Sequence, residues 1–147
     1  MSTPRGIRNN NPLNIRLSKD RWQGQIAPSL SGRAGGEASF CQFQTMQYGY
    51  RAAFKLLKTY MGKYRCHTIR QIIHKWAPPR ENDTNAYVRR VAGISKLNPD
   101  VIIAFWHKQT MIDLAYAMTI VENGVAVDKE VIAQGYALAE GSVSGVK

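Results

Sequence analysis

The sequence has few cysteines, few histidines and few acidic residues. Its 147 residues include two cysteines, three histidines and ten Asp and Glu residues. Cys41 and Cys66 lack the paired spacing of metal ligands, and the histidines do not complete a set, so we expect no metal site and no other cofactor. Two buried free thiols are the simplest interpretation of the cysteines.

Long apolar stretches are also absent. No apolar run reaches the roughly 18 residues that a membrane-spanning helix needs. The first residues, MSTPRGIRNNNP, lack the apolar core of a secretory signal. We therefore expect a chain that is made in the cytoplasm without a signal peptide and that needs another delivery route if it acts outside it.

Positive charge, in contrast, is abundant. Twenty Lys and Arg residues against ten acidic residues give a formal net charge of +10. Such a charge favours an anionic partner, which can be nucleic acid, an anionic membrane surface or a bacterial envelope rich in carboxylates and phosphates. The alternative is that the charge serves solubility alone.

Helical periodicity begins after the first third of the chain. Residues 46–61 place apolar side chains on one helix face, at Tyr50, Phe54, Leu57 and Met61. Thr68 and Gln71 form a capping-box pattern, which predicts a second helix that ends near Trp76.

Two further short helices have recognisable ends. Asp83 or Thr84 is expected to cap a helix that ends at Gly93. A last helix is expected to start at Asp128 and to run to about Ala139.

Between these two helices lies the most apolar stretch of the chain. Asn98, Pro99 and Asp100 form a helix-start pattern, with a cap residue, a proline and then an acid. The stretch from there to Glu122 is expected to form either one long helix or two helices with a break near His107.

The remaining elements complete a small mainly α (α+β) fold. WQGQIA (22–27) and ASFCQF (38–43) are strand candidates, joined by a loop rich in glycine and serine, which predicts a small β-hairpin. We expect five to six helices and this hairpin in a single domain of residues 1–140, followed by a flexible tail of residues 141–147.

Glu122 continues the buried face of the apolar stretch. Met118, Ala115 and Met111 precede it by four, seven and eleven residues, so all four lie on one side of a helix, and Gly124 then ends the helix. Loss of water and the negative helix end both favour the protonated carboxyl and raise its pKa. Such a group suits general acid catalysis of glycoside cleavage. The simpler interpretation is a half-exposed glutamate where the helix reaches water.

Four segments together resemble the lysozyme-like superfamily, in particular peptidoglycan-cleaving transglycosylases and glucosaminidases. The segments are AMTIVENG, RNNNPLNIR, FCQFQTMQYGYRAAFKLL and ENDTNAYVRRV. The first is similar to the helix end that carries the catalytic glutamate, and the second to an asparagine-rich turn beside the active site. The last is similar to a helix that presents a tyrosine, here Tyr87, to the glycan cleft. The resemblance implies a lysozyme-like fold and cleavage of peptidoglycan strands.

The order of these segments differs from the usual order in that family. Here the asparagine turn precedes the glutamate helix, and a circular permutation would reconcile the two, because the termini of compact domains often lie close together. The start RGIRNNNPLNIR is also similar to small phage virion and prophage proteins of this group. The resemblance therefore implies a protein of phage virion or prophage type.

The resemblance implies three candidate acids. Glu122 is the first, as general acid and base. Glu37, before the second strand candidate, is the second, although it is equally well a polar residue of a glycine-rich loop. Glu81 is the third, and its alternative role is in the turn and cap of the ENDT segment. In a transglycosylase no second carboxylate is needed, whereas in an inverting muramidase Glu37 or Glu81 would activate water.

Amide side chains suit N-acetyl sugars because they donate and accept hydrogen bonds. We therefore expect Asn11, Asn14 and Gln42 to bind substrate, with Asn11 alternatively a turn residue. Tyr87 and Glu81 are the other substrate-binding candidates, and Tyr87 is alternatively a core aromatic. Among the tryptophans, Trp22 is the candidate for the cleft wall, whereas two are expected in the core, Trp76 and Trp106.

The expected partners are peptidoglycan glycan strands, anionic envelope polymers and virion proteins. Action at the cell wall or periplasm would require delivery by a virion, a holin or a secretion system. One alternative is a non-catalytic lysozyme-like structural protein of a virion. The other is a basic nucleic-acid-binding module, for which Arg89 and Arg90 are the available cations, although no recognised binding motif is present.

Overall fold

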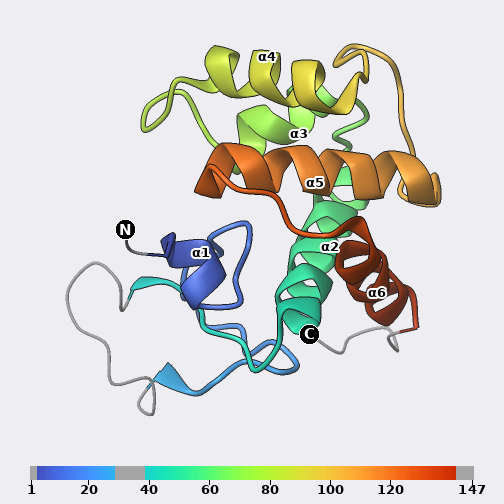
Figure 1. The fold of residues 1–147 in the computed structure, drawn as a ribbon. Coiled ribbons are helices and arrows are strands. Elements are labelled where there is room, and N and C mark those ends of the chain that lie inside the picture. The colour runs from blue at the N-terminus through green and yellow to red at the C-terminus, as the bar shows by residue number, and fades with distance from the viewer. Residues whose placement is uncertain (1–2, 29–38, 142–147) are drawn as a thin grey trace.

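The structure, a computed structural model, describes residues 3–28 and 39–141. The chain forms six helices in this described part (Figure 1), namely α1 (Arg5–Arg8), α2 (Met46–Gly62), α3 (Ile69–Trp76), α4 (Thr84–Ser95), α5 (Lys108–Asn123) and α6 (Lys129–Glu140). The fold is therefore mainly helical, as predicted. No helix in the described ranges is long and apolar enough to cross a membrane.

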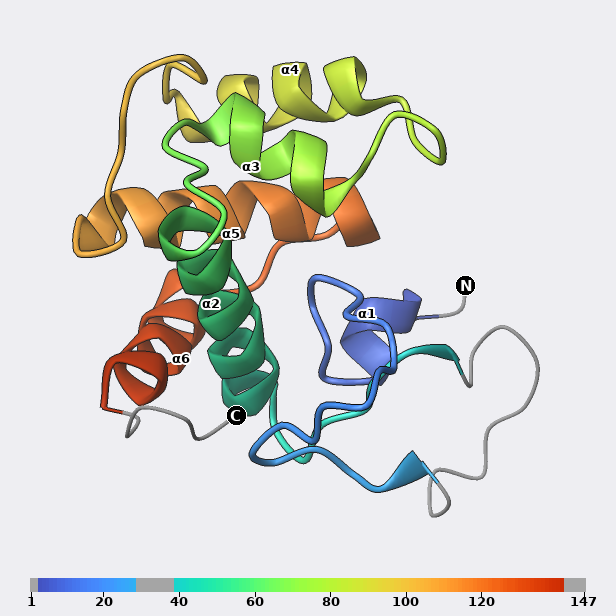
Figure 2. The same ribbon diagram turned by 180° about the vertical axis from the view of Figure 1, so that it is seen from behind.

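The core lies where α5 meets the other long helices. In both views α5 lies between the α3–α4 pair and the α2–α6 pair (Figures 1 and 2). The predicted inner face of α2 is buried, with Tyr50, Phe54 and Leu57 fully inaccessible to solvent. The Phe54 ring meets the Tyr136 ring of α6 edge-on, at a centroid distance of 5.2 Å. Aromatic packing of this kind holds α6 against α2.

Three of the expected helix starts are confirmed by hydrogen bonds. The side chains of Thr68, Asp83 and Asp128 each accept a hydrogen bond from a backbone N–H in the first turn of the helix that follows. The second bond of the Thr68 capping box differs from the expected pattern, because Gln71 Oε1 accepts from the backbone N–H of His67 at 2.7 Å rather than from Thr68. Local sequence thus determines these three starts.

One expected helix end is wrong, and one helix was not expected. Helix α4 continues past Gly93 to Ser95 and ends at Lys96, which has a φ of 63°. Gly93 is exposed and helical, so it needs no left-handed conformation there. Helix α1 was not expected at all, because four residues after Pro4 are too few for a periodic pattern.

The helix start predicted at residues 98–100 is also wrong. Residues 98–107 contain turns, and α5 begins only at Lys108. Asn98 Oδ1 accepts a hydrogen bond from the backbone N–H of Asp100 at 2.9 Å, which closes a local turn. Asp100 also pairs with Arg70 of α3, with 2.7 Å between Arg70 Nε and Asp100 Oδ1. These contacts fix residues 98–100 outside a helix, so neither the one long helix nor the two helices with a break near His107 is formed, and only the part from Lys108 onward is helical.

The predicted hairpin is reduced to two isolated antiparallel bridges within the described residues, Arg16–Phe40 and Gln25–Phe43. The segment 39–44 is shared between two partners. Cys41 donates its N–H to the carbonyl of Ile15, whereas Gln42 accepts from Ile26. Because the segment changes partner after two or three residues, neither pairing becomes a strand.

Residues 142–147 of the predicted tail lie outside the described residues, so the tail and the single-domain boundary stay predictions. Trp106 was expected in the core and is 77% exposed, so that expectation is wrong. Trp22 is buried, and Trp76 is partly buried beside a cavity.

The contact of α2 with α6 allows a direct test of this packing. A Cβ atom at Gly135 would lie 2.4 Å from Tyr50 Cβ, so Gly135→Ala is expected to lower the free energy of unfolding by about 1–3 kcal/mol. Gly93→Ala, at a helical position with open space around it, is the matched control and is expected to raise it by about 0.5–1 kcal/mol. Urea unfolding of both variants measures the difference, and equal effects would contradict the close approach of the helices.

Candidate functional site

Glu122 lies in the last turn of α5. The helix ends at Gly124, which has a φ of 74°, and this left-handed conformation is one that glycine adopts without strain. The Glu122 side chain is partly buried and accepts two hydrogen bonds. Asn14 Nδ2 donates to Oε1 at 2.9 Å, and Tyr87 Oη donates to Oε2 at 2.9 Å. Three segments distant in sequence therefore meet at one carboxyl group.

The loop of residues 9–14 places Asn14. Asn10 and Asn14 have φ values of 51° and 55°, a conformation that asparagine tolerates better than most residues. Asn11 is completely buried and holds the loop together. Its Oδ1 accepts from the N–H of Ile15 at 2.9 Å, and its Nδ2 donates to the carbonyls of Ile15 and Cys41 at 3.0 Å. The asparagine run thus builds a rigid support for Asn14.

The end of α5 is fixed to the same loop. Asn123 Nδ2 donates to the carbonyl of Pro12 at 2.8 Å and to that of Thr119 at 3.0 Å. Two consecutive residues of α5, Glu122 and Asn123, thus both bond to the loop. The carboxyl of Glu122 is therefore held by its own helix end as well as by its two donors.

The surroundings of Glu122 shift the pKa of its carboxyl. Removal from water raises the pKa of this carboxyl, whereas the hydrogen bonds from Asn14 and Tyr87 and the positive charge of Arg5 oppose the increase. The pKa of Tyr87 is raised well above its ordinary value, first by burial and then by the adjacent Glu122. Tyr87 therefore keeps its proton and can both donate and accept a hydrogen bond.

A polar cavity of about 270 Å³ opens at Glu122. Its described lining residues come from residues 5–16, from Phe40, from the end of α3 and the α3–α4 loop, and from α5. They are Arg5, Leu13, Asn14, Arg16, Phe40, Trp76, Ala77, Pro78, Glu81, Asn82 and Glu122. A second cavity of about 370 Å³ shares Asn14, Arg16 and Trp76 with it. The two cavities therefore share a wall beside the carboxyl.

Two guanidinium groups stand in the first cavity. Arg5 Cζ lies 4.2 Å and Arg16 Cζ 4.9 Å from the centre of the Phe40 ring. The ring attracts both cations, although they repel each other. When Glu122 is protonated, Glu81 is the charged acid among the described lining residues, so the cavity then has an excess of positive charge and can accept an anionic group.

The structure brings four of the predicted site residues to one place, and they include Glu122 itself. Asn14 and Tyr87 bond to Glu122, and Glu81, which is exposed, lines the same cavity. Glu37 lies outside the described residues.

Asn11 and Gln42 do not line the site. For Asn11 the substrate-binding assignment is corrected, because its side chain is completely buried and bonded to the backbone. Gln42 is half-buried and is not among the described residues that line either cavity.

Sequence reasoning did not identify the remaining lining residues. Arg5, Arg16 and Phe40 lie in segments without periodicity, so no sequence signal placed them beside Glu122. Trp76, expected in the core, lines both cavities. Among the residues that the structure describes, no group of three or more His, Cys, Asp and Glu side chains is arranged to hold a metal ion.

Comparison with known proteins gives a similarity to a phage protein. No protein-family model matches the sequence. The chain is similar to Protein P5 of Pseudoalteromonas phage PM2, with 42% identity over 91 residues, which are 60% of this chain and 53% of that protein. The chain thus spans about half the length of the curated relative that it matches. The similarity supports the predicted association with phages.

The raised pKa of Glu122 has a consequence for stability. The pKa of this carboxyl is higher in the folded state than in the unfolded state. At pH values between these two pKa values the folded state binds more protons, so the free energy of unfolding falls as the pH rises through this range. Glu122→Gln keeps an acceptor for Asn14 and is expected to be more stable than the parent at neutral pH. Its advantage should disappear at acid pH, where the parent carboxyl is protonated in both states.

Urea unfolding at a series of pH values measures this effect. Glu81→Gln, which removes an exposed carboxyl from the same cavity, is the control and should show no comparable gain. If Glu122→Gln were no more stable than the parent at neutral pH, the argument from burial would fail.

Proposed function

We propose that this chain is a lysozyme-like protein that cleaves the glycan strands of peptidoglycan, with Glu122 as general acid and base. The observation that carries the proposal is the partly buried Glu122 carboxyl, held by Asn14 and Tyr87 at the edge of a polar cavity. Acids of this kind, with a pKa raised by burial, protonate the leaving oxygen in glycoside cleavage.

The two hydrogen bonds indicate where the proton is carried. Asn14 Nδ2 can only donate, so Oε1 remains an acceptor in either charge state of Glu122. The proton is therefore assigned to Oε2, beside Tyr87 Oη, whose oxygen can accept a hydrogen bond. After Glu122 has given its proton to the glycosidic oxygen, Tyr87 donates to the carboxylate that remains. Tyr87 thus stabilises the charge that develops during bond cleavage.

Two routes can follow, and Glu81 takes part in only one of them. If a group of the substrate attacks the sugar ring, Glu122 returns as base and no second carboxylate takes part. If water attacks, Glu81 is the described carboxylate in the same cavity that can activate it, and an inverting reaction needs a carboxyl separation of about 6.5–9.5 Å.

The charge of the cavity fits the proposed substrate. Peptidoglycan carries carboxylates on its peptides, and Arg5 and Arg16 offer two guanidinium groups next to the acid. The net charge of +10 would attract the protein to the anionic envelope as a whole. Delivery by a virion, and contact with virion proteins there, belong to this proposal and are supported by the similarity to a phage protein.

A catalytically silent structural protein of a virion is the second candidate function. The same similarity to a phage protein favours it, because a fold can be kept where the reaction is lost. A nucleic-acid-binding role has weaker support, since Arg89 and Arg90 are exposed on α4 without a recognised binding motif.

Digestion of purified peptidoglycan tests the proposed activity. The parent protein is expected to release soluble muropeptides, and Glu122→Gln is expected to lower the rate about 10²–10⁴-fold because the proton donor is lost. Mass spectrometry of the products distinguishes anhydro ends, which indicate attack by the substrate itself, from reducing ends, which indicate attack by water.

Glu81→Gln serves as the internal comparison in this experiment. If the parent protein forms reducing products, Glu81→Gln should lose most of its activity. If the parent forms anhydro products, Glu81→Gln should keep its activity. Circular dichroism of each variant confirms that the fold is intact. A parent protein that releases no muropeptides would refute the proposed activity and favour the structural role.

The hydrogen bond from Tyr87 is expected to set the alkaline limit of activity. Because this bond lowers the pKa of Glu122, Tyr87→Phe should raise that pKa further. The fall of kcat/KM with rising pH should then begin at a higher pH than in the parent, and the maximal rate should fall about tenfold. Tyr64→Phe, at an exposed tyrosine, is the control. An unchanged alkaline limb in Tyr87→Phe would exclude Glu122 as the group that titrates.

A further inference from the structure

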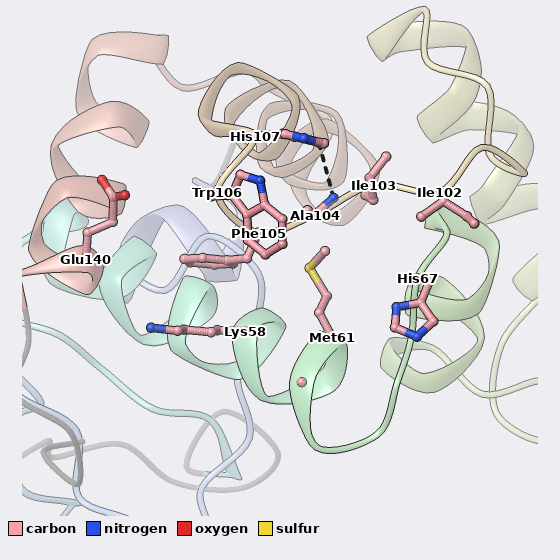
Figure 3. A pocket seen from close by; sticks show the side chains of 11 residues that line it. Lys58, Met61, His67, Ile102, Ile103, Ala104, Phe105, Trp106, His107 and Glu140 are labelled. Carbon is pink, nitrogen blue, oxygen red and sulfur yellow. Dashed lines mark hydrogen bonds between the residues drawn. The ribbon is translucent and has the colours of Figure 1, made fainter.

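A separate cavity of about 690 Å³ lies at the other end of α5. Its described lining residues come from α2, the segment 102–107 and the end of α6, with His67 from the loop before α3 (Figure 3), and they are Lys58, Met61, Gly62, His67, Ile102, Ile103, Ala104, Phe105, Trp106, His107 and Glu140. Helix α5 has 16 residues, so its two ends are about 24 Å apart. The cavity is therefore distinct from the site at Glu122.

The rim of this cavity exposes large apolar side chains. Ile102 is 75% exposed, Trp106 is 77% exposed and the adjoining Val101 is 53% exposed. Figure 3 shows Ile102 and Trp106 on either side of Met61, which projects from α2 and is buried. Large apolar side chains exposed around a cavity favour a binding site there.

The backbone holds these side chains in place. The N–H of Ile103 donates to the carbonyl of His67 at 2.8 Å, and Tyr136 Oη donates to the carbonyl of Phe105 at 2.6 Å. The Phe105 ring stacks on the Tyr136 ring, at a centroid distance of 5.2 Å, inside the fold. The segment is thus anchored at Ile103 and Phe105, between the exposed residues Ile102 and Trp106, so their exposure is a feature of the fold.

The α2 helix below the cavity is basic, and the cavity itself is lined by charges of both signs. The sequence contains no Asp or Glu between Glu37 and Glu81, a stretch that includes all of α2 and α3. Lys58 lines the cavity, and Lys63 follows α2 and is exposed. Glu140 is the acidic residue among the described lining residues. Exposed apolar side chains that include a tryptophan, on a protein with a net charge of +10, fit the interface of an anionic bilayer.

We propose that the segment 101–106 inserts into the surface of a lipid bilayer with anionic headgroups, with Ile102 and Trp106 in the acyl boundary and Lys58 at the headgroups. A bilayer fits better than a peptide in the groove, because the most exposed apolar side chains stand on the rim, whereas Met61 on the floor is already buried. Tryptophan also prefers this interface, where its ring is partly apolar and its N–H stays hydrated.

Vesicle flotation tests the proposal with the full chain. The protein is expected to float with vesicles of phosphatidylcholine and phosphatidylglycerol and to bind pure phosphatidylcholine vesicles much more weakly. The double variant Ile102→Ser, Trp106→Ser should bind the mixed vesicles at least about tenfold more weakly. Val125→Ser, at an apolar residue that is 45% exposed elsewhere, is the matched control and should bind like the parent. Lys58→Gln should reduce binding about fivefold.

Tryptophan fluorescence gives an independent readout. The emission of the parent protein should shift to shorter wavelength on the mixed vesicles, and Trp106→Phe should abolish the shift while Trp22 and Trp76 remain. Trp106→Phe keeps an aromatic side chain at a surface position and is expected to fold. It can therefore test the proposal even if the double variant does not fold.

Three results would overturn the proposal. They are no binding to mixed vesicles, equal binding to both kinds of vesicle, and undiminished binding of the double variant, which would mean that charge alone attracts the protein. Release of soluble muropeptides should be the same in the double variant and the parent, so the outcome is separate from that of the peptidoglycan experiment.

Discussion

The paired hydrogen bonds of Asn14 and Tyr87 to the Glu122 carboxyl are the interaction on which the rest of the site depends. The three residues come from the N-terminal loop, α4 and the end of α5. A partly buried carboxyl without donors would be costly in the folded state, whereas two donors make it tolerable without cancelling the effect of burial on its pKa. The packing of α4 on α5 and the rigid asparagine loop both serve this arrangement.

The fold could be predicted from sequence wherever a local signal decides the structure. The start of α3 at Thr68 and the start of α6 after Asp128 depend on side chains that bond within one turn, so their patterns were sufficient. Residues 98–100 show the limit of this reasoning. Their helix-start pattern is overridden by Arg70 of α3, which pairs with Asp100 and donates its N–H to the carbonyl of Pro99.

The same distinction applies to the candidate site. The position of Glu122 on a buried face followed from helical spacing, because Met118 and Met111 on that face are indeed buried. The placement of Arg5 and Arg16 beside it did not, because it depends on how segments without periodicity cross in space. The carboxyl could thus be found from sequence, but the charges that surround it required the structure.

The bond between Asn14 and Glu122 joins residues 108 positions apart. Ribosomes build a chain from its amino end, so the loop that supplies Asn14 is complete long before α5 exists. The carboxyl arrives only when α5 has been synthesised, and until then Asn14 lacks this acceptor. A polypeptide that ends before α5 therefore lacks the acid centre, and in the proposed role a producing cell would contain the activity only in molecules that include α5.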